Sequence, residues 1–187
     1  MKILAFAASN SRNSINRMLL DYAIARLRDF LPEAEVETLD LNDYEMPIYS
    51  IDREHEDGIP TRAREFFDRI KASDAVLVSF AEHNGFTTAA WKNIFDWMSR
   101  IETKLWQGKP LLMLAASPGP RAGAGVLSSQ EKLAPHFGAD LRGSLGIGKW
   151  SDAWNADTAQ LNLREDIDVL DAMLLRLIEP PAGAPEA

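Results

Sequence analysis

The segment ILAFAASNSRNSIN, residues 3–16, runs from an apolar stretch through polar residues into a helical pattern. Its first six residues are all apolar, which is typical of a strand buried on both faces of a parallel sheet. Its polar part contributes Ser9, Ser11, Arg12, Ser14 and Asn16, with Ile15 between the last two. The free N–H groups and the dipole of a helix start favour negative charge, and an arginine can bind two phosphate oxygens at once. The segment therefore predicts a phosphate-binding turn. The alternative is that Ser14 or Asn13 only caps the helix.

Composition limits the classes of protein to which this chain can belong. The 187 residues carry a formal net charge of −8, which disfavours binding to nucleic acid or to an anionic membrane. There is no cysteine, so disulfides and thiolate chemistry are excluded, and His55, His83 and His136 lack the spacing of a zinc site. We expect a cytoplasmic protein with one domain over residues 1–179 and a disordered tail over 180–187.

Strand and helix patterns alternate along the chain. Strand patterns cover residues 3–8, 36–41, 75–80, 111–116 and 141–147. Helical patterns cover residues 15–31, 60–70, 88–101, the segment that ends near 136, and 157–178. Residues 42–60 read as a long polar connection, which is functional or part of an interface in most compact domains. The alternation predicts an α/β fold: a three-layer, doubly wound, five-stranded parallel sheet in the flavodoxin-like order 2-1-3-4-5.

This strand order predicts a single site at one edge of the sheet. The carboxyl ends of the first, third and fourth strands meet at its switch point, where ligands bind. The loop after the third strand contains Glu82, His83, Asn84 and Gly85. The loop after the fourth strand contains Ser117, Pro118, Gly119, Arg121 and Gly123. With the phosphate turn, these loops suit a ligand that has a phosphate at one end and a polar planar ring at the other.

Each loop also has a plainer interpretation. The Ser-Pro-Gly-Pro sequence after the fourth strand is ordinary turn chemistry, and Glu82 with His83 can be a surface pair. A lone loop histidine is more often incidental than a general base. Trp91, Phe95 and Met98 form a helical apolar stripe that indicates core or subunit interface.

Three motifs make the chain resemble the NAD(P)H-dependent FMN reductase family, which includes chromate and quinone reductases. The family's phosphate loop, Gly-Ser-x-Arg-x-x-Ser-x-Asn, corresponds to residues 8–16, with Ala8 for glycine and one more residue before Arg12. Its Pro-Glu-Tyr-Asn motif corresponds to residues 81–84, which read Ala-Glu-His-Asn. The helical motif Leu-Lys-Asn-x-x-Asp-Trp corresponds to residues 91–97, and the motif Ser-x-Gly-x-x-Gly-Gly corresponds to residues 117–123. Each segment matches its motif at most but not all positions.

The resemblance implies a bound FMN that accepts hydride from NADPH or NADH and reduces a quinone, an azo compound, free flavin or a similar acceptor. The first loop would hold the phosphate, and residues 82–85 and 117–123 would frame the ring. Phe86 or Trp91 is a minor candidate to cover the flavin. No side chain is expected to act as an essential acid or base.

The resemblance also implies a homodimer or homotetramer, with residues 42–60 and the helix of Trp91 as candidate interface elements. Two alternatives remain open at this point. The first is a flavodoxin-type FMN electron carrier that does not react with NAD(P)H. The second is a flavodoxin-like binding module that has lost FMN. The reason to consider it is that the second and third loops depart from the family's motifs.

Overall fold

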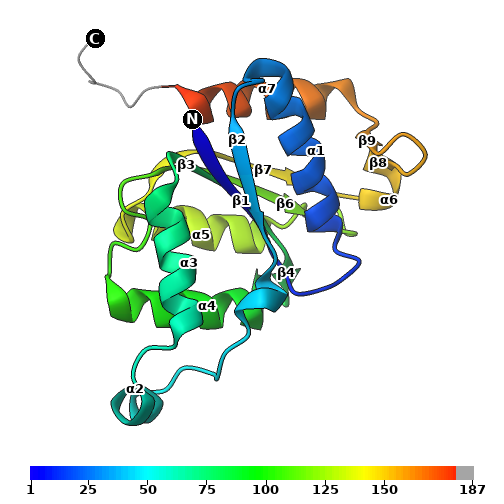
Figure 1. The fold of residues 1–187 in the computed structure, drawn as a ribbon. Helices are drawn as coiled ribbons and strands as arrows, with labels where there is room; N and C mark the ends of the chain where they lie inside the picture. Colours follow the sequence, from blue (N-terminus) through cyan, green and yellow to red (C-terminus); the bar gives the residue numbers. More distant parts are fainter. Residues whose placement is uncertain (180–187) are drawn as a thin grey trace.

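A five-stranded parallel sheet forms the centre of the computed structural model, which describes residues 1–179. Its strands are β1 (Lys2–Ala8), β2 (Glu35–Leu39), β3 (Ala75–Phe80), β6 (Pro110–Ala116) and β7 (Asp140–Ile147). They lie in the order β2-β1-β3-β6-β7 (Figure 1), so the predicted order 2-1-3-4-5 is confirmed. The tail expected over 180–187 lies outside the described residues.

Helices cover both faces of this sheet. The long helices are α1 (Ile15–Phe30), α3 (Thr61–Ala72), α4 (Ala89–Ile101), α5 (Ala124–His136) and α7 (Arg164–Ile178). Helices α1 and α7 pack together on one face, and α3, α4 and α5 cover the other. The three-layer arrangement is therefore confirmed, and the ends of β1, β3 and β6 are brought to a common edge.

The first strand shows how the sequence produces two cores. Leu4, Phe6 and Ala8 point into the core beneath α3 and α4, whereas Ile3 and Ala5 point into the core beneath α1 and α7. Successive strand residues alternate between faces, so an all-apolar run fills both.

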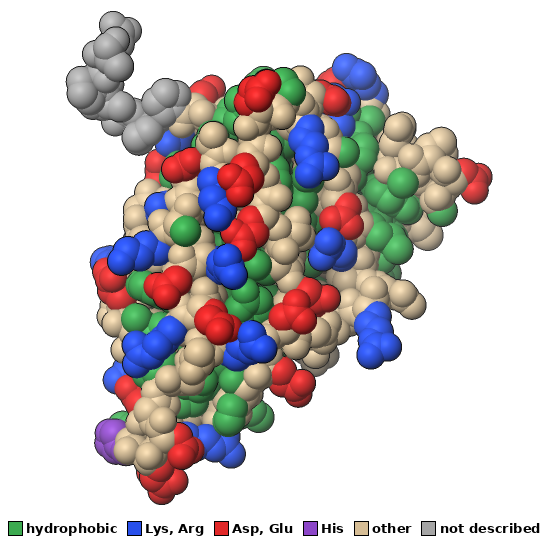
Figure 2. All heavy atoms as spheres, viewed as in Figure 1, with side chains coloured by type: hydrophobic (Ala, Val, Ile, Leu, Met, Phe, Trp, Pro, Cys, Tyr) green, Lys and Arg blue, Asp and Glu red, His purple; other side chains and the backbone are tan. Residues whose placement is uncertain are grey.

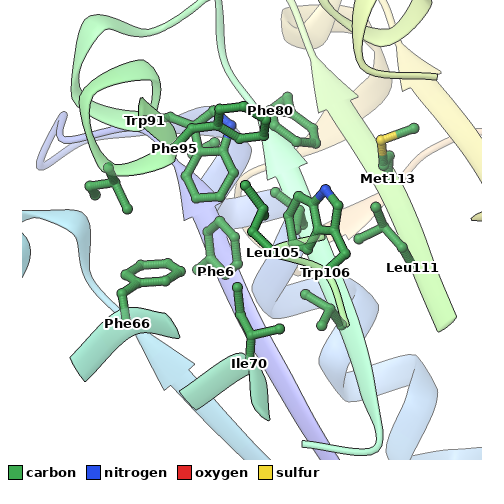
Figure 3. Packing of buried hydrophobic residues seen from close by; sticks show 14 of the residues in the cluster. Phe6, Phe66, Ile70, Phe80, Trp91, Phe95, Leu105, Trp106, Leu111 and Met113 are labelled. Carbon is green, nitrogen blue, oxygen red and sulfur yellow. The ribbon is translucent and has the colours of Figure 1, made fainter. Parts of the chain in front are cut away.

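The core beneath α4 is strongly aromatic. Trp91 is fully buried there, with its ring centroid 5.0 Å from that of Phe6 and 5.7 Å from that of Trp106 (Figure 3). Phe95 and Met98 belong to the same core, so the core interpretation of this stripe is confirmed. Trp91 is enclosed by its neighbours and cannot cover a flavin, so that minor candidate was wrong.

Residues 42–60 contain more regular structure than expected. A 3-10 helix, η1 (Leu41–Tyr44), begins at the end of β2, and a two-turn helix, α2 (Ile51–Asp57), begins after Ser50. Ser50 accepts a hydrogen bond from the backbone of Arg53, and Gly58 ends the helix with a φ of 74°. The helix has no buried residue, so it carries no apolar periodicity by which to recognise it.

The final helix begins seven residues later than the predicted 157. Residues 150–161 instead form a short helix, α6 (Trp150–Ala153), and a hairpin of β8 (Trp154–Asn155) and β9 (Gln160–Leu161). The side chain of Asn155 accepts hydrogen bonds from the backbone of Asp157 and Thr158, which makes the turn. This local side-chain bonding competes with a helix at those residues.

On the face shown in Figure 2, neither sign of charge dominates, because lysines and arginines are interspersed with acidic residues. Among residues 1–179, no helix combines the length and the apolar character that crossing a bilayer requires.

Candidate functional site

A cleft of about 300 Å³ opens at the carboxyl ends of β1, β3 and β6. Its walls come from all three loops that the sequence singles out. They are Ser9, Ser11, Asn13, Ser14, Ile15 and Asn16 from the first loop, Ala81, Glu82 and His83 from the second, and Ala116, Ser117 and Pro118 from the third. The cleft lies at the switch point between β1 and β3, where ligands bind in this class of fold.

The first loop presents an open helix start. Ser14 caps α1, because its hydroxyl accepts a hydrogen bond from the backbone of Arg17, so the capping interpretation holds for this residue. No hydrogen bond among residues 1–179 engages the backbone N–H groups of Ile15 and Asn16. The first turn also has no acidic residue. These two N–H groups and the helix dipole therefore remain available to an anion.

The side chains around this helix start leave it accessible. Ser9 is buried and accepts a hydrogen bond from the backbone of Ser11, which folds the loop back on itself. Arg12 is exposed, and no ion pair joins it to any other residue of the described range. A second hollow of about 270 Å³ on the β2 side shares Ser9, Ser11 and Ser14 and is also lined by Arg12. The loop is thus accessible from two sides, with a free guanidinium at its tip.

Asn16 has a different role from the one expected. Its side chain is buried and donates to the carbonyl of Ala116, while its Oδ1 accepts from the backbone of Ala116 and from the hydroxyl of Ser79. All three bonds go to β3 and β6, so the amide is committed to holding the strand ends together. Only the backbone of Asn16 is free to face a ligand in the cleft.

Glu82 connects the second loop to the third. Its Oε2 accepts a hydrogen bond of 2.9 Å from the backbone of Val126, in the first turn of α5. A carboxylate is stabilised at this position by the helix dipole. The chain's own carboxylate thus occupies the start of α5, whereas the first turn of α1 has no acidic residue.

The second loop is a β-hairpin. Strands β4 (Glu82–His83) and β5 (Phe86–Thr87) are joined by a two-residue turn in which Asn84 and Gly85 have φ values of 55° and 83°. An Asn-Gly pair is favoured in such a turn, because both residues tolerate a positive φ. His83 and Asn84 are exposed, and Gly85 is half-buried. The predicted loop residues are therefore together, with His83 lining the cleft and Asn84 and Gly85 at the hairpin tip.

The hairpin turn lies against the start of α5. A Cβ at Gly125 would lie 2.7 Å from the carbonyl oxygen of Gly85 and 2.9 Å from Oε2 of Glu82. Only glycine permits this close approach. Gly125 thus helps to position the second loop against the third. In the sequence, its only signal was that it lies in a glycine-rich segment.

The third loop is fixed by its backbone. The hydroxyl of Ser117 accepts from the N–H of Gly119, and its carbonyl accepts from the N–H of Trp150. Gly123 adopts a left-handed conformation, and a Cβ there would lie 2.6 Å from that of Ala115. Packing beneath α5 therefore requires a glycine at this position. Arg121 is 79% exposed, with its guanidinium 3.9 Å from the Glu82 carboxylate, and Pro118 is exposed at the rim.

Two residues of the α4 motif hold the preceding segment in place. Asn93 donates to the carbonyls of Met46 and Pro47 and accepts from the backbone of Tyr49. The indole of Trp97 donates to the same Pro47 carbonyl at 2.8 Å. Residues 46–49, which we call the strap, are therefore fastened along α4.

A further contact secures the strap on its far side. The hydroxyl of Tyr49 donates to Glu54, which also pairs with Arg100 of α4. Desolvation, and then this bond to a carboxylate, raise the pKa of Tyr49 above its ordinary value.

Thr88 is the anchoring residue that the sequence reasoning missed. Its hydroxyl donates to the carbonyl of Ala8 at the end of β1 and accepts from the backbone of Trp91. It thus caps α4 and fixes the hairpin end against the first loop. Its place at the first position of the predicted helix, residues 88–101, was the available signal, since threonine is common at a helix cap.

Comparison with known proteins agrees with this geometry. Residues 1–151 match the model of a family described as NADPH-dependent FMN reductase. A quinone reductase of Escherichia coli (strain K12) is 27% identical over 125 residues, which are 66% of this chain and 64% of that protein. An NAD(P)H-dependent FMN reductase of Pseudomonas aeruginosa is 31% identical over 119 residues, 64% of this chain and 61% of that protein. The chain thus matches less than two thirds of the length of either relative.

Solved structures share the fold. FerB, a flavoenzyme NAD(P)H:(acceptor) oxidoreductase from Paracoccus denitrificans, superimposes with a TM-score of 0.71 at 23% identity, covering 94% of each chain. An azoreductase from Bacillus anthracis str. Sterne gives a TM-score of 0.68 at 18% identity, covering 95% of this chain and 99% of that one. With most of its length matched by the family model, the chain belongs to the NADPH-dependent FMN reductase family.

Proposed function

We propose that this protein binds FMN and uses it to transfer electrons from NADPH or NADH to a small-molecule acceptor such as a quinone or an azo compound. The observation that carries the proposal is a cleft lined by all three loops at the switch point of the sheet. Membership of the FMN reductase family supports the cofactor, and the names of its quinone reductase and azoreductase relatives support the acceptor class.

The residues present fit FMN at the phosphate end. A phosphate monoester needs several donors and a compensating positive charge. The α1 start offers the free N–H groups of Ile15 and Asn16, the exposed hydroxyl of Ser11 and the unpaired Arg12. The Glu82 carboxylate at the α5 start repels a phosphate from that end. FMN is thereby oriented with its phosphate at α1.

The other end of the cleft fits the ring. Residues 81–83 and 116–118 line it, and Ser117 and the third loop are held by bonds to β7 and α6. The backbone N–H and C=O groups of these fixed loops would pair with the polar edge of a planar heterocycle without rearrangement. When bound, FMN supplies the hydride chemistry. The chain positions it, excludes water from one side and leaves the His83 side open.

The wider setting is part of the same proposal. We place the activity in one domain over residues 1–179, in the cytoplasm, and in a homodimer or homotetramer. The strap and the adjoining α2 suit an interface, because Ile48 is 75% exposed and Ile51 is 57% exposed. Analytical ultracentrifugation of the wild type against Ile48→Asp tests this part, with a monomeric variant as the expected result.

The visible spectrum of the purified protein tests the proposed function. We expect the protein to bind FMN stoichiometrically and its yellow colour to bleach when NADPH or NADH is mixed in without oxygen. Addition of a quinone should then restore the colour. A protein that binds FMN but stays oxidised would instead be an electron carrier. One that remains colourless after incubation with FMN would be a binding module, and either result would overturn the proposal.

A further inference from the structure

A second cavity adjoins the cleft and has a different character. It measures about 510 Å³ and is lined by His83, Asn84, Phe86, Thr87, Ala89 and Lys92. His83 also lines the first cleft, so this one residue is common to the walls of both. A molecule in the second cavity therefore lies directly beside a molecule in the first. The volume is within the range of small-molecule sites.

The hairpin places two rings on one face of this cavity. His83 and Phe86 are directly opposite in the β4–β5 register, and the other pair is Glu82 with Thr87. Because side chains alternate along a strand, His83 and Phe86 share one face while Glu82 turns toward α5. Phe86 is 69% exposed, and His83 is exposed beside it.

This exposed pair is held rigidly from both ends. Glu82 fastens the start of the hairpin to the backbone of Val126, and Thr88 fastens its end to the carbonyl of Ala8. A large apolar ring that a rigid scaffold exposes to water can still gain free energy when a ligand buries it. Its position next to the cleft points to a ligand rather than to folding, since Phe86 belongs to neither core cluster.

The charges around the cavity define the kind of ligand. The ammonium of Lys92 is paired with both carboxylate oxygens of Asp96 at 2.7 Å, so its charge is already balanced. The remaining walls are a phenyl ring, an imidazole, a methyl group and polar groups of the turn. This lining favours a neutral planar aromatic molecule that packs against a ring and accepts one hydrogen bond.

We propose that Phe86 and His83 form an acceptor shelf, which binds the ring of a neutral quinone beside the FMN cleft. The shelf rests on the proposed function, since it specifies where the acceptor of that reaction binds. Phe86 supplies contact area and determines preference for aromatic acceptors, and His83 lies at the border between the acceptor and the cofactor cleft.

Direct binding of 1,4-naphthoquinone to the FMN-loaded, oxidised protein tests the shelf by equilibrium dialysis. Loss of the ring in Phe86→Ala should raise the dissociation constant about tenfold, and Phe86→Tyr should stay within about twofold of wild type. Leu163→Ala removes another large exposed apolar side chain, from the segment before α7, and should bind as wild type does. In steady-state assays Phe86→Ala should raise KM for the quinone far more than it lowers kcat.

The shelf is overturned if Phe86→Ala binds the quinone as tightly as the wild type does. Circular dichroism confirms that each variant is folded, and titration with FMN reports on the cleft separately. Failure of the wild type to bind FMN or to react with NAD(P)H would overturn the proposed function. Unchanged quinone binding in Phe86→Ala, with a wild type that does both, overturns the shelf alone.

Discussion

The Glu82 carboxylate, which follows β3, closes the first turn of α5 by accepting a 2.9 Å hydrogen bond from the backbone of Val126. This bond joins two of the three loops that form the cleft. It also places a negative charge at one helix start while the neighbouring start, that of α1, stays open. The two helix starts at the cleft therefore differ in charge, since one carries a carboxylate and the other does not.

Removing the Glu82 carboxylate should destabilise the protein. Glu82→Ala leaves the N–H of Val126 without its partner, and we expect a loss of about 1–2 kcal/mol in the free energy of unfolding. Glu82→Gln keeps an acceptor oxygen and should lose less. Urea denaturation followed by circular dichroism measures both variants. Equal stability of Glu82→Ala and the wild type would show that the bond contributes nothing to folding.

The close approach at Gly125 gives a second prediction. Gly125→Ala places a Cβ 2.7 Å from the carbonyl of Gly85, so the hairpin must move away from α5. We expect destabilisation of about 1–3 kcal/mol, together with weaker FMN binding. Gly119→Ala is the matched control for stability, because the nearest atom to its Cβ is Oγ of Ser117 at 3.7 Å. If both variants unfold at the same urea concentration, the contact is looser than the structure shows.

Asn16 should be among the most sensitive polar residues. Asn16→Ala leaves the N–H of Ala116 unsatisfied in the core, together with that residue's carbonyl and the hydroxyl of Ser79. The expected loss is about 2–4 kcal/mol of unfolding free energy, while Ser79→Ala, which removes one bond, should lose about 1 kcal/mol. Thermal and urea unfolding of both variants provide the measurement. Similar losses for the two would contradict a network centred on Asn16.

Arg12 should contribute to cofactor affinity without contributing to stability. If its guanidinium binds the FMN phosphate, Arg12→Ala weakens FMN binding by about 1.5–3 kcal/mol. Isothermal titration calorimetry measures this, and riboflavin, which lacks the phosphate, should bind the variant and the wild type equally. Arg164→Ala, an exposed arginine on α7, is the control. Unchanged FMN affinity in Arg12→Ala would show that the guanidinium points away from the phosphate.

The strap should be released when Asn93 is truncated. Asn93→Ala removes three hydrogen bonds to residues 46–49, and trypsin cleavage at the adjoining Arg53 should become about tenfold faster. Asp96→Ala, which removes only a surface ion pair with Lys92 from the same helix, should be cleaved as the wild type is. Mass spectrometry of timed digests identifies the site. Equal cleavage rates for the two variants would mean that other contacts hold the strap.

Much of the fold follows from local patterns in the sequence. The apolar runs at 3–8, 75–80 and 111–116 read directly as buried strands, because a strand covered on both faces needs apolar residues at every position. The helical stripes, including that of Trp91, are similarly local. The predictions failed where no apolar periodicity marks the element. Helix α2 has no buried residue, and the β8–β9 hairpin is formed by a turn in place of the predicted start of the last helix.

From the sequence by itself, the alternation of strand and helix patterns predicted the strand order, and the polar residues after the first strand predicted a helix start that could bind an anion. Only the tertiary structure decided what the polar side chains do. Asn16 bonds to Ala116, Glu82 to Val126 and Asn93 to Met46, across 100, 44 and 47 positions of sequence. A side chain's type shows that it needs a partner, but that partner is chosen by packing, which no local pattern encodes. For this reason the scaffold roles of Asn16 and Gly123, which the sequence suggested only as ligand-binding residues, became visible in the tertiary structure alone.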